Sequence, residues 1–298
     1  MWYTVTMNVQ IIGNDLVISG LKDFDLRHIF DCGQCFRWNE TGENAYLGVA
    51  MGKALKIKQQ GDSIILFDTS KEDFENIWYD YFDLGRDYGK IKRTLAKDDI
   101  MKTATKYGEG IRILNQDLWE TVVSFIISSS NNIPRIKGII ERLCAMYGNE
   151  IEYMGEIYYT FPDCYTLAKL TREDLAPIRA GYRDKYILDA AQKFADGTLT
   201  DKYIRSLPTP KAKKALLSVN GIGEKVANCI LLFGLQRTES FPVDVWIKRI
   251  MEYCYFSGET AIPAIAALAE EKFGDLGGFA QQYLFFYARE EKIGPEKG

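Results

Sequence analysis

Residues 216–250 read LLSVNGIGEKVANCILLFGLQRTESFPVDVWIKRI and carry the strongest local signals in the chain. An apolar helix end is followed by a tight turn at residues 220–223 and by a second helix that begins near Glu224. The two glycines of the turn permit a positive φ and a sharp reversal, and the apolar Ile222 between them can anchor the turn in the core. The backbone N–H groups at the turn and at the helix start then point outward, which suits a bound phosphate.

Two charged residues stand at the helix starts of this stretch. Lys225 lies in the first turn of the second helix, where the helix dipole disfavours a cation and therefore favours a neutral, nucleophilic amine. Asp244 stands at the expected N-cap of the next helix, and it approaches Lys225 if the intervening helix folds back. The residues alone leave an alternative open, which is an ordinary helix–turn–helix with an exposed lysine and a capping aspartate.

The composition is that of a globular protein. The chain has 298 residues, of which 47% are hydrophobic and 26% are charged, and this length predicts two or three domains. The formal net charge of −4 does not indicate nucleic-acid binding, but such binding depends on a local basic face. Residues 90–93 and 211–214 are candidates for that face, and each is equally compatible with a solvated helix surface.

The cysteines and the apolar runs narrow the class further. Cys32 and Cys35 form a lone CxxC pattern without a second pair, which favours neither a zinc site nor a redox site, and no cysteine follows Cys254. We therefore expect no metal, no cofactor and no iron–sulfur cluster. We see no signal-peptide pattern and no apolar run of membrane-spanning length. The prediction is a cytoplasmic monomer without membrane contact, associated with the nucleoid in a bacterium or nuclear in a eukaryote.

The predicted fold class is α+β. Residues 1–110 are expected to form an N-terminal antiparallel β-sheet domain with flanking helices. Its β-branched runs lie at 9–12, 16–18, 45–51, 54–58 and 63–68, and its helices at 26–30 and 71–95. Residues 111–298 are predicted to form two all-α subdomains, with the helix-hairpin-helix at about 211–234. Further helical spacing occurs at 117–144, 163–170, 172–178, 179–194, 261–273 and 277–292.

The turn and the downstream aspartate together resemble a known family. Gly221-Ile222-Gly223-x-Lys225, followed by Pro242-Val243-Asp244, is similar to the helix-hairpin-helix (Gly/Pro-Asp) DNA glycosylases. The lysine resembles that of their bifunctional glycosylase/lyase branch, and the chain as a whole resembles the 8-oxoguanine DNA glycosylase/lyases. The resemblance implies double-stranded DNA containing 8-oxoguanine opposite cytosine as the substrate. It also implies that Lys225 forms a Schiff base and that Asp244 stabilises the transition state. Trp246 stands where the family often has a histidine, beside the phosphate-binding hairpin.

Three further segments carry the damaged-base part of the resemblance. GQCFRW at 33–38 is similar to the family's N-terminal GQ-x-FRW segment, in which the Gly33 carbonyl would accept a hydrogen bond from N7–H of 8-oxoguanine. Gln281 and Phe285 lie at i and i+4 of one predicted helix, and they would pair with the purine edge and stack on its ring. Cys229, one turn after the lysine, would cover the opposite face of the base. Without the resemblance, the same residues read as a turn glycine and a core helix face.

Two segments carry the opposite-base part. SSSNNIPR at 128–135 interrupts an apolar helix with residues that favour turns and caps, and it is similar to a family loop that enters the DNA. Ser130 departs from the asparagine that the family has at that position. A Gly-Tyr-Arg turn then supplies Tyr182 as a wedge and Arg183, together with Arg135, as a reader of cytosine. The DNA-contacting residues implied on this side are Asn131, Asn132, Arg135, Tyr182 and Arg183.

Two other functions stay open from the sequence. One is a related helix-hairpin-helix glycosylase for another damaged base, which the combination of Gly33, Gln281 and Phe285 disfavours. The other is a non-catalytic DNA-binding module, which needs the hairpin but neither Lys225 nor Asp244. Borohydride trapping on lesion-containing duplex separates these alternatives.

Overall fold

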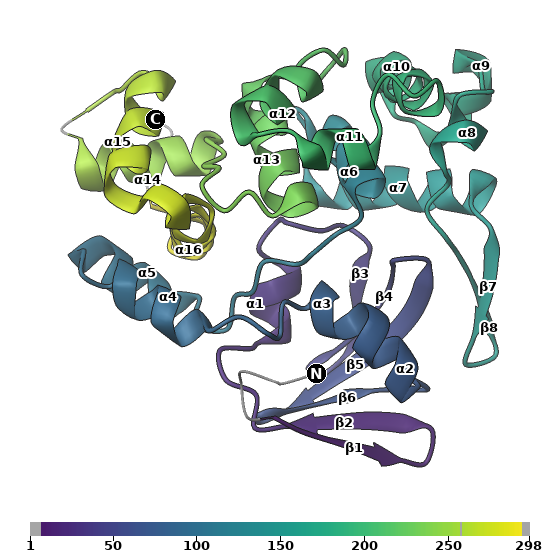
Figure 1. Cartoon of the computed structure of the whole chain (residues 1–298), viewed down its shortest axis with the longest axis horizontal. Coiled ribbons are helices and arrows are strands. Elements are labelled where there is room, and N and C mark those ends of the chain that lie inside the picture. Colours follow the sequence, from purple (N-terminus) through teal and green to yellow (C-terminus); the bar gives the residue numbers. More distant parts are fainter. Residues whose placement is uncertain (1–6, 257, 294–298) are drawn as a thin grey trace.

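The computed structural model describes residues 7–256 and 258–293, and it begins with a six-stranded antiparallel sheet (Figure 1). The strand order is β1-β2-β6-β5-β4-β3. The strands are β1 (Asn8–Ile12), β2 (Asp15–Ser19), β3 (Trp38–Gly42), β4 (Ala45–Ala50), β5 (Lys53–Gln60) and β6 (Ser63–Leu66). Alternate residues of β2, β5 and β6 are fully buried, as expected for a sheet with one covered face. The predicted antiparallel sheet is confirmed.

The helix predicted over 71–95 is wrong as a single element. The structure divides it into α2 (Lys71–Asp73), a π-helical turn η1 (Phe74–Trp78), α3 (Tyr79–Tyr81) and, after a break, α4 (Tyr88–Leu95). Asp83 lies in the break with a φ of 49°, and its carboxylate accepts hydrogen bonds from Arg86 and from the Tyr88 hydroxyl. A left-handed residue ends a helix, and aspartate tolerates that conformation better than most residues do. The short helix α1 (Leu26–Phe30) forms as predicted, with Asp25 as its N-cap.

Helices α4 and α5 (Asp99–Tyr107) lie beside the C-terminal helix α16 (Gly277–Glu290) rather than on the sheet (Figure 1). Their buried residues Tyr88, Leu95 and Met101 belong to the same apolar core as the later helices, whereas the sheet has a separate core. The domain boundary near residue 110 stays a prediction. Packing nevertheless joins residues 88–107 to the helical part of the molecule.

The remaining helices form two groups (Figure 1). The first contains α6 (Leu118–Ser128), α7 (Ile133–Tyr147), α8 (Cys164–Leu167), α9 (Arg172–Leu175), α10 (Asp184–Ala195), α11 (Asp201–Ser206), α12 (Thr209–Leu216) and α13 (Glu224–Leu235), with the 3-10 turns η2 (Ala176–Ile178) and η3 (Gly181–Arg183). The second contains α14 (Val245–Tyr255), α15 (Ile262–Phe273), the 3-10 turn η4 (Gly274–Leu276) and α16. This arrangement confirms the predicted α+β class with a helical region after the sheet.

A short β-hairpin corrects the prediction that everything after residue 110 is helical. Strands β7 (Glu150–Tyr153) and β8 (Glu156–Tyr159) pair through a turn in which Met154 and Gly155 have positive φ. The Tyr153 hydroxyl accepts from the backbone N–H of Lys56 at 3.0 Å and donates to the carbonyl of Phe67 at 2.7 Å. These two bonds tie the hairpin to the N-terminal sheet. Residues 150–153 read Glu-Ile-Glu-Tyr, an alternation typical of a strand, but four residues are too few to predict one with certainty.

Candidate active site

The helix-hairpin-helix motif forms between α12 and α13. Gly221 has a φ of 85°, and a Cβ there would lie 2.4 Å from Cγ of Tyr186, so glycine is required on two grounds. Ile222 is buried beneath the turn, as predicted. Gly223 is the N-cap of α13 without a side-chain cap, and a Cβ on it would meet no atom within 4 Å. The first amides of α13 are therefore open to solvent and to an anion.

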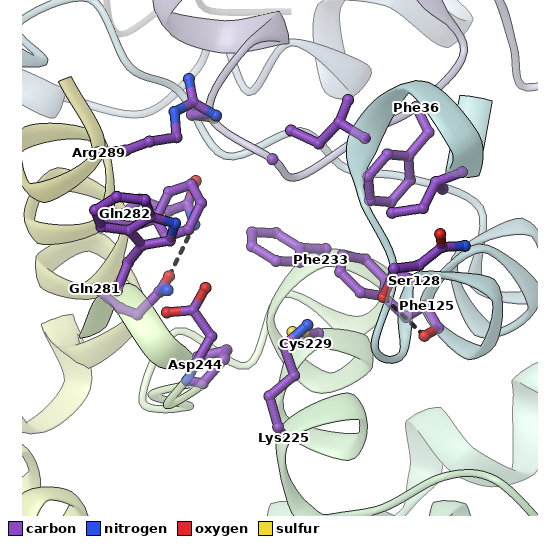
Figure 2. A pocket seen from close by; sticks show the side chains of 18 of the residues that line it. Phe36, Phe125, Ser128, Lys225, Cys229, Phe233, Asp244, Gln281, Gln282 and Arg289 are labelled. Atoms are coloured by element: carbon purple, nitrogen blue, oxygen red, sulfur yellow. Dashed lines mark hydrogen bonds between the residues drawn. The ribbon is translucent and has the colours of Figure 1, made fainter. Parts of the chain in front are cut away.

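A cavity of about 350 Å³ opens between the two helical groups (Figure 2). It is bounded by α6 and α13 on one side, by α14 and α16 on the other, and by the segment before β3. The predicted site residues that line it are Gly33, Asn131, Asn132, Lys225, Cys229, Asp244, Trp246, Gln281 and Phe285. Residues from four distant parts of the chain thus meet around one space. A cavity of this size suits a nucleobase that has been flipped out of the duplex, whereas a DNA-binding surface without a cavity has no place for one.

Lys225 stands at the mouth of this cavity on the first turn of α13. Its Nζ lies 5.5 Å from the centroid of the Phe125 ring, and that ring stacks on Phe233 with centroids 5.4 Å apart. Within the described residues, no carboxylate lies close enough to Lys225 for an ion pair. Cys229 follows one helical turn later, where burial raises the pKa of its thiol and Lys225 opposes that shift. The lysine is therefore presented on an aromatic wall beside a neutral thiol.

Asp244 faces Lys225 and Cys229 from the opposite side of the cavity (Figure 2). As predicted, it is the N-cap of α14, and its Oδ1 accepts from the backbone N–H of Ile247 at 2.8 Å. Burial raises the pKa of Asp244, although the Ile247 N–H and the charge of Lys225 counteract that effect in part. The cap fixes the orientation of the carboxylate while leaving it directed at the cavity.

The third wall combines a glycine, a ring and two amides. Gly33 has a φ of 77°, and a Cβ there would lie 3.2 Å from Cε1 of Phe285, so any larger residue would press on that ring. In the described parts of the chain, no donor occupies the Gly33 carbonyl. Gln281 is 4% exposed, and its Oε1 accepts from Nε2 of Gln282 at 2.8 Å. Oε1 of Gln282 is buried and has no hydrogen-bond donor in the described structure, so this wall contains an acceptor that a ligand could use.

Sequence reasoning missed several residues of the cavity. Phe36, Phe125 and Phe233 line it, but in the sequence they look like ordinary core aromatics. Arg289 lies 5.5 Å from the Phe285 ring centroid and donates to the Asp31 carbonyl, which supports the ring from behind. Its position one turn after Phe285 on the same helix face was an available signal.

The loop predicted to enter the DNA has an unusual backbone. Ser130 has a φ of 48°, and Asn132 caps α7 by accepting from the backbone N–H of Arg135 at 3.0 Å. Nδ2 of Asn131 donates to the Ile127 carbonyl at 3.0 Å. The Arg135 side chain and the Tyr182 ring are exposed, the latter by 50%. The loop is therefore stabilised by its own amides and leaves these two side chains at the surface.

Arg183, the predicted reader of the opposite base, is engaged with backbone carbonyls in this structure. It is only 3% exposed, and its guanidinium donates to the carbonyls of Ser129, Ser130 and Ala180. It also lies 4.6 Å from the centroid of the Tyr182 ring. The donor fork satisfies carbonyls of the neighbouring loop, and a contact of Arg183 with the opposite base stays a prediction. Arg183 in this structure fixes the loop.

Trp246 lies apart from the two hairpin glycines, Gly221 and Gly223, beside which the sequence predicts it. It lines the cavity next to Asp244, with the guanidinium of Arg249 5.3 Å from its ring centroid. Gly221 and Gly223 do not line the cavity. A phosphate contact of Trp246 stays a prediction.

In the described residues we find no helix whose length and apolar character would let it cross a membrane.

Comparison with known proteins places both halves of the chain. Residues 16–122 match the family described as 8-oxoguanine DNA glycosylase, N-terminal domain, and residues 123–275 match the HhH-GPD superfamily base excision DNA repair proteins. An N-glycosylase/DNA lyase of Saccharomyces cerevisiae is 31% identical, over 77% of this chain and 68% of its own.

Two solved structures are similar over nearly the whole chain. The 8-oxoguanine glycosylase/lyase of Clostridium acetobutylicum, in complex with double-stranded DNA containing cytosine opposite 8-oxoguanine, has a TM-score of 0.93 and 40% identity. That match covers 98% of this chain and 100% of the other. The structure of MBOgg1 in complex with a low-affinity DNA ligand has a TM-score of 0.94 and 48% identity, over 97% of this chain and 100% of that one.

Proposed function

Because the chain belongs to the HhH-GPD superfamily of base excision DNA repair proteins, we propose that it is a bifunctional 8-oxoguanine DNA glycosylase and lyase. The observation that carries the proposal is the meeting of Lys225 and Asp244 at one cavity whose far wall holds Gly33, Gln281 and Phe285. A DNA-binding module needs no such cavity. The substrate is duplex DNA, from which the damaged nucleotide is extruded into the cavity.

Base recognition depends on the Gly33 carbonyl. 8-Oxoguanine carries a hydrogen on N7 and can donate to this carbonyl, whereas guanine presents an acceptor there. An acceptor left without a donor in a buried site costs about 1–3 kcal/mol, which corresponds to about ten- to hundredfold discrimination. The Gln281 amide meets the Watson–Crick edge, and the base lies between the Phe285 ring and the Cys229 thiol.

Base release and strand incision follow from the lysine. The Lys225 amine attacks C1′ as the bond from C1′ to N9 breaks, and the proton lost by the nitrogen is available to the departing base. The Asp244 carboxylate stabilises the positive charge that develops on the sugar. The bond from C1′ to O4′ then breaks, the remaining N–H proton passes to O4′, and a Schiff base between Lys225 and C1′ forms. Loss of a proton from C2′ then expels the 3′ phosphate by β-elimination.

The remaining parts of the surface suit the DNA around the lesion. The open amides of α13 suit a backbone phosphate, and Arg135 and Tyr182 suit the base opposite the lesion, for which we infer cytosine. We propose that the protein acts as a monomer where chromosomal DNA is held.

The test is borohydride trapping on a duplex with 8-oxoguanine opposite cytosine. We expect a covalent adduct and release of the base with the wild-type protein, and no adduct with Lys225→Gln or with undamaged duplex. Base release without an adduct would indicate hydrolysis by an activated water, and binding without release would indicate a non-catalytic module. A duplex with an alkylated base in parallel tests the alternative substrate class.

A further inference from the structure

One face of α10 holds the turn of the helix-hairpin-helix motif from outside. Tyr186, Asp189 and Lys193 lie at i, i+3 and i+7 of this helix, and this spacing puts all three on one face. Each of them contacts the segment between α12 and α13. None of the three lines the cavity in which the chemistry is proposed to occur.

Asp189 makes the densest set of these contacts. Its Oδ2 accepts from the backbone N–H of Asn220 at 2.8 Å, and its Oδ1 accepts from the side-chain amide of the same residue at 3.0 Å. Lys193 donates to Oδ2 of Asp189 at 2.8 Å and to the Ser218 carbonyl at 2.6 Å. An N–H and a C=O of the turn are thus satisfied by an ion pair on another helix. Hydrogen bonds with one charged partner are shorter and stronger than neutral ones.

Tyr186 fixes the same turn from below. Its ring atoms Cγ and Cδ2 would lie 2.4 and 2.5 Å from a Cβ on Gly221, so the backbone of the turn rests directly on the ring. The carboxylate of Asp189 therefore fixes the turn at Asn220, and the ring fixes it at the next residue. Together they determine where the exposed amides of Gly223 and of the first turn of α13 point.

We propose that Asp189 is a positioning residue for base excision, which holds the hairpin so that the bound DNA strand is aligned with Lys225. The proposal rests on the proposed function and extends it to a residue outside the cavity. The body of α13 packs against α6, whereas its first turn, which carries Lys225, follows the hairpin directly. A shift of the hairpin therefore moves the anion site and the bound DNA backbone relative to the rest of the cavity. A displacement of about 1 Å between reacting groups can reduce a rate about hundredfold.

The contacts of Asp189 favour its charged form. Burial acts to raise the pKa of Asp189, but the hydrogen bonds from Lys193 and Asn220 outweigh burial and lower it. The contact between Asp189 and Asn220 is therefore charge-assisted at neutral pH. Substitutions of Asp189 can separate its capacity to accept hydrogen bonds from its charge.

The experiment compares three variants in single-turnover release of 8-oxoguanine at saturating protein, at a temperature where circular dichroism shows each to be folded. Asp189→Leu removes both acceptors and should slow release by about tenfold to hundredfold. Asp189→Asn keeps an oxygen for the Asn220 N–H, and its release rate should stay within about threefold of the wild type. Arg172→Met is the matched control. This substitution breaks an ion pair between Nε of Arg172 on α9 and Oδ2 of Asp184 on α10, which are 3.1 Å apart. The pair lies away from the hairpin, so its loss should leave the rate of base release unchanged.

The outcomes separate the two proposals. A wild-type protein that releases no 8-oxoguanine overturns the proposed function itself. With an active wild type, a wild-type rate in Asp189→Leu overturns the positioning role, even if that variant melts at a lower temperature. An equal loss in Asp189→Leu and Asp189→Asn would show that the hairpin is held by the charge of Asp189 and its ion pair with Lys193. A slow Asp189→Leu with a near-normal Asp189→Asn supports the positioning role.

Discussion

The damaged-base cavity and the opposite-base loop are adjacent, but they hold their polar side chains in different ways. In the cavity, Lys225, Asp244 and the Gln281 amide all border one open space. On the loop side, Arg183 already donates to three backbone carbonyls, and Arg135 stays exposed. The cavity is organised before DNA arrives, whereas the loop uses its buried arginine to support itself. We therefore expect strong selection of the lesion and weaker selection of its partner base.

Lys225→Gln should have the largest effect on the rate of base release, and it changes only the cavity, not the opposite-base loop. Loss of the nucleophile should reduce base release by about 10³-fold or more and abolish borohydride trapping, because no other lysine lines the described cavity. Affinity for lesion duplex, measured by fluorescence anisotropy, should change little. Lys202→Gln on the exposed face of α11 serves as the control and should behave as wild type. Normal excision by Lys225→Gln would remove the lysine from the mechanism.

Asp244→Asn should come next. Asparagine caps a helix about as well as aspartate, so α14 should stay intact while the charge is lost. We expect base release to fall by about 10²–10³-fold, with duplex affinity preserved or improved because a negative charge near DNA is removed. Single-turnover rates and binding isotherms check both parts. A collapse of affinity with normal release from the bound fraction would reduce Asp244 to a structural cap.

Gln281→Ala and Phe285→Ala sharpen the contrast between reading the base and breaking the strand. Each should slow 8-oxoguanine release by about tenfold, since a lost hydrogen bond or stacking contact is worth about 1–3 kcal/mol. Incision of a duplex with a preformed abasic site has no base to read and should continue at the wild-type rate. Equal losses on both substrates, or a fall in Tm that accounts for the change, would favour a packing role for these side chains.

Arg135→Met compared with Arg183→Met tests the loop side. Arg135 is exposed, so its replacement should leave Tm unchanged and narrow the preference for cytosine over adenine by a few-fold, mainly by slowing the cytosine duplex. Arg183→Met leaves carbonyls of Ser129 and Ser130 without their donor, so it should lower Tm and slow both duplexes alike. Single-turnover excision on the two duplexes gives the ratios. A lost cytosine preference with unchanged stability in Arg183→Met would show that this arginine leaves the loop to read the base.

The smallest expected effect concerns stability and the charge in the cavity. The folded-state pKa of Asp244 is raised above 3.8, so the folded protein retains a proton that the unfolded chain has already lost. Stability therefore falls as pH rises from the unfolded value through the folded one, and at pH 7 the carboxylate is a net cost. Asp244→Asn should melt above the wild type at pH 7 and near it at pH 3, with about 2–4 °C gained per kcal/mol recovered. Melting curves at the two pH values check this. If the difference in Tm between Asp244→Asn and the wild type is the same at both pH values, the charge of Asp244 is not its cause.

Some of this site was readable from the sequence because its signals are local. The hairpin around Gly221 depends on neighbours in the chain, and Gln281 and Phe285 are one helical turn apart. The engagement of Arg183 was not readable, because it depends on where the carbonyls of a loop more than fifty residues earlier come to lie. The hairpin β7–β8 was missed for a related reason. Its anchor, the Tyr153 hydroxyl, bonds to backbone groups of a distant sheet.

The walls of the cavity are drawn from residue 32 at one extreme and residue 289 at the other. During synthesis, Gly33 emerges long before Phe285, whose ring lies against it. At about 5–20 residues per second, the interval is roughly 10–50 s. For most of that interval the nascent chain also lacks the hairpin before α13, and it has no complete place for a base until α16 has been made. We therefore infer that a ribosome-bound fragment without α16 is unable to select a lesion.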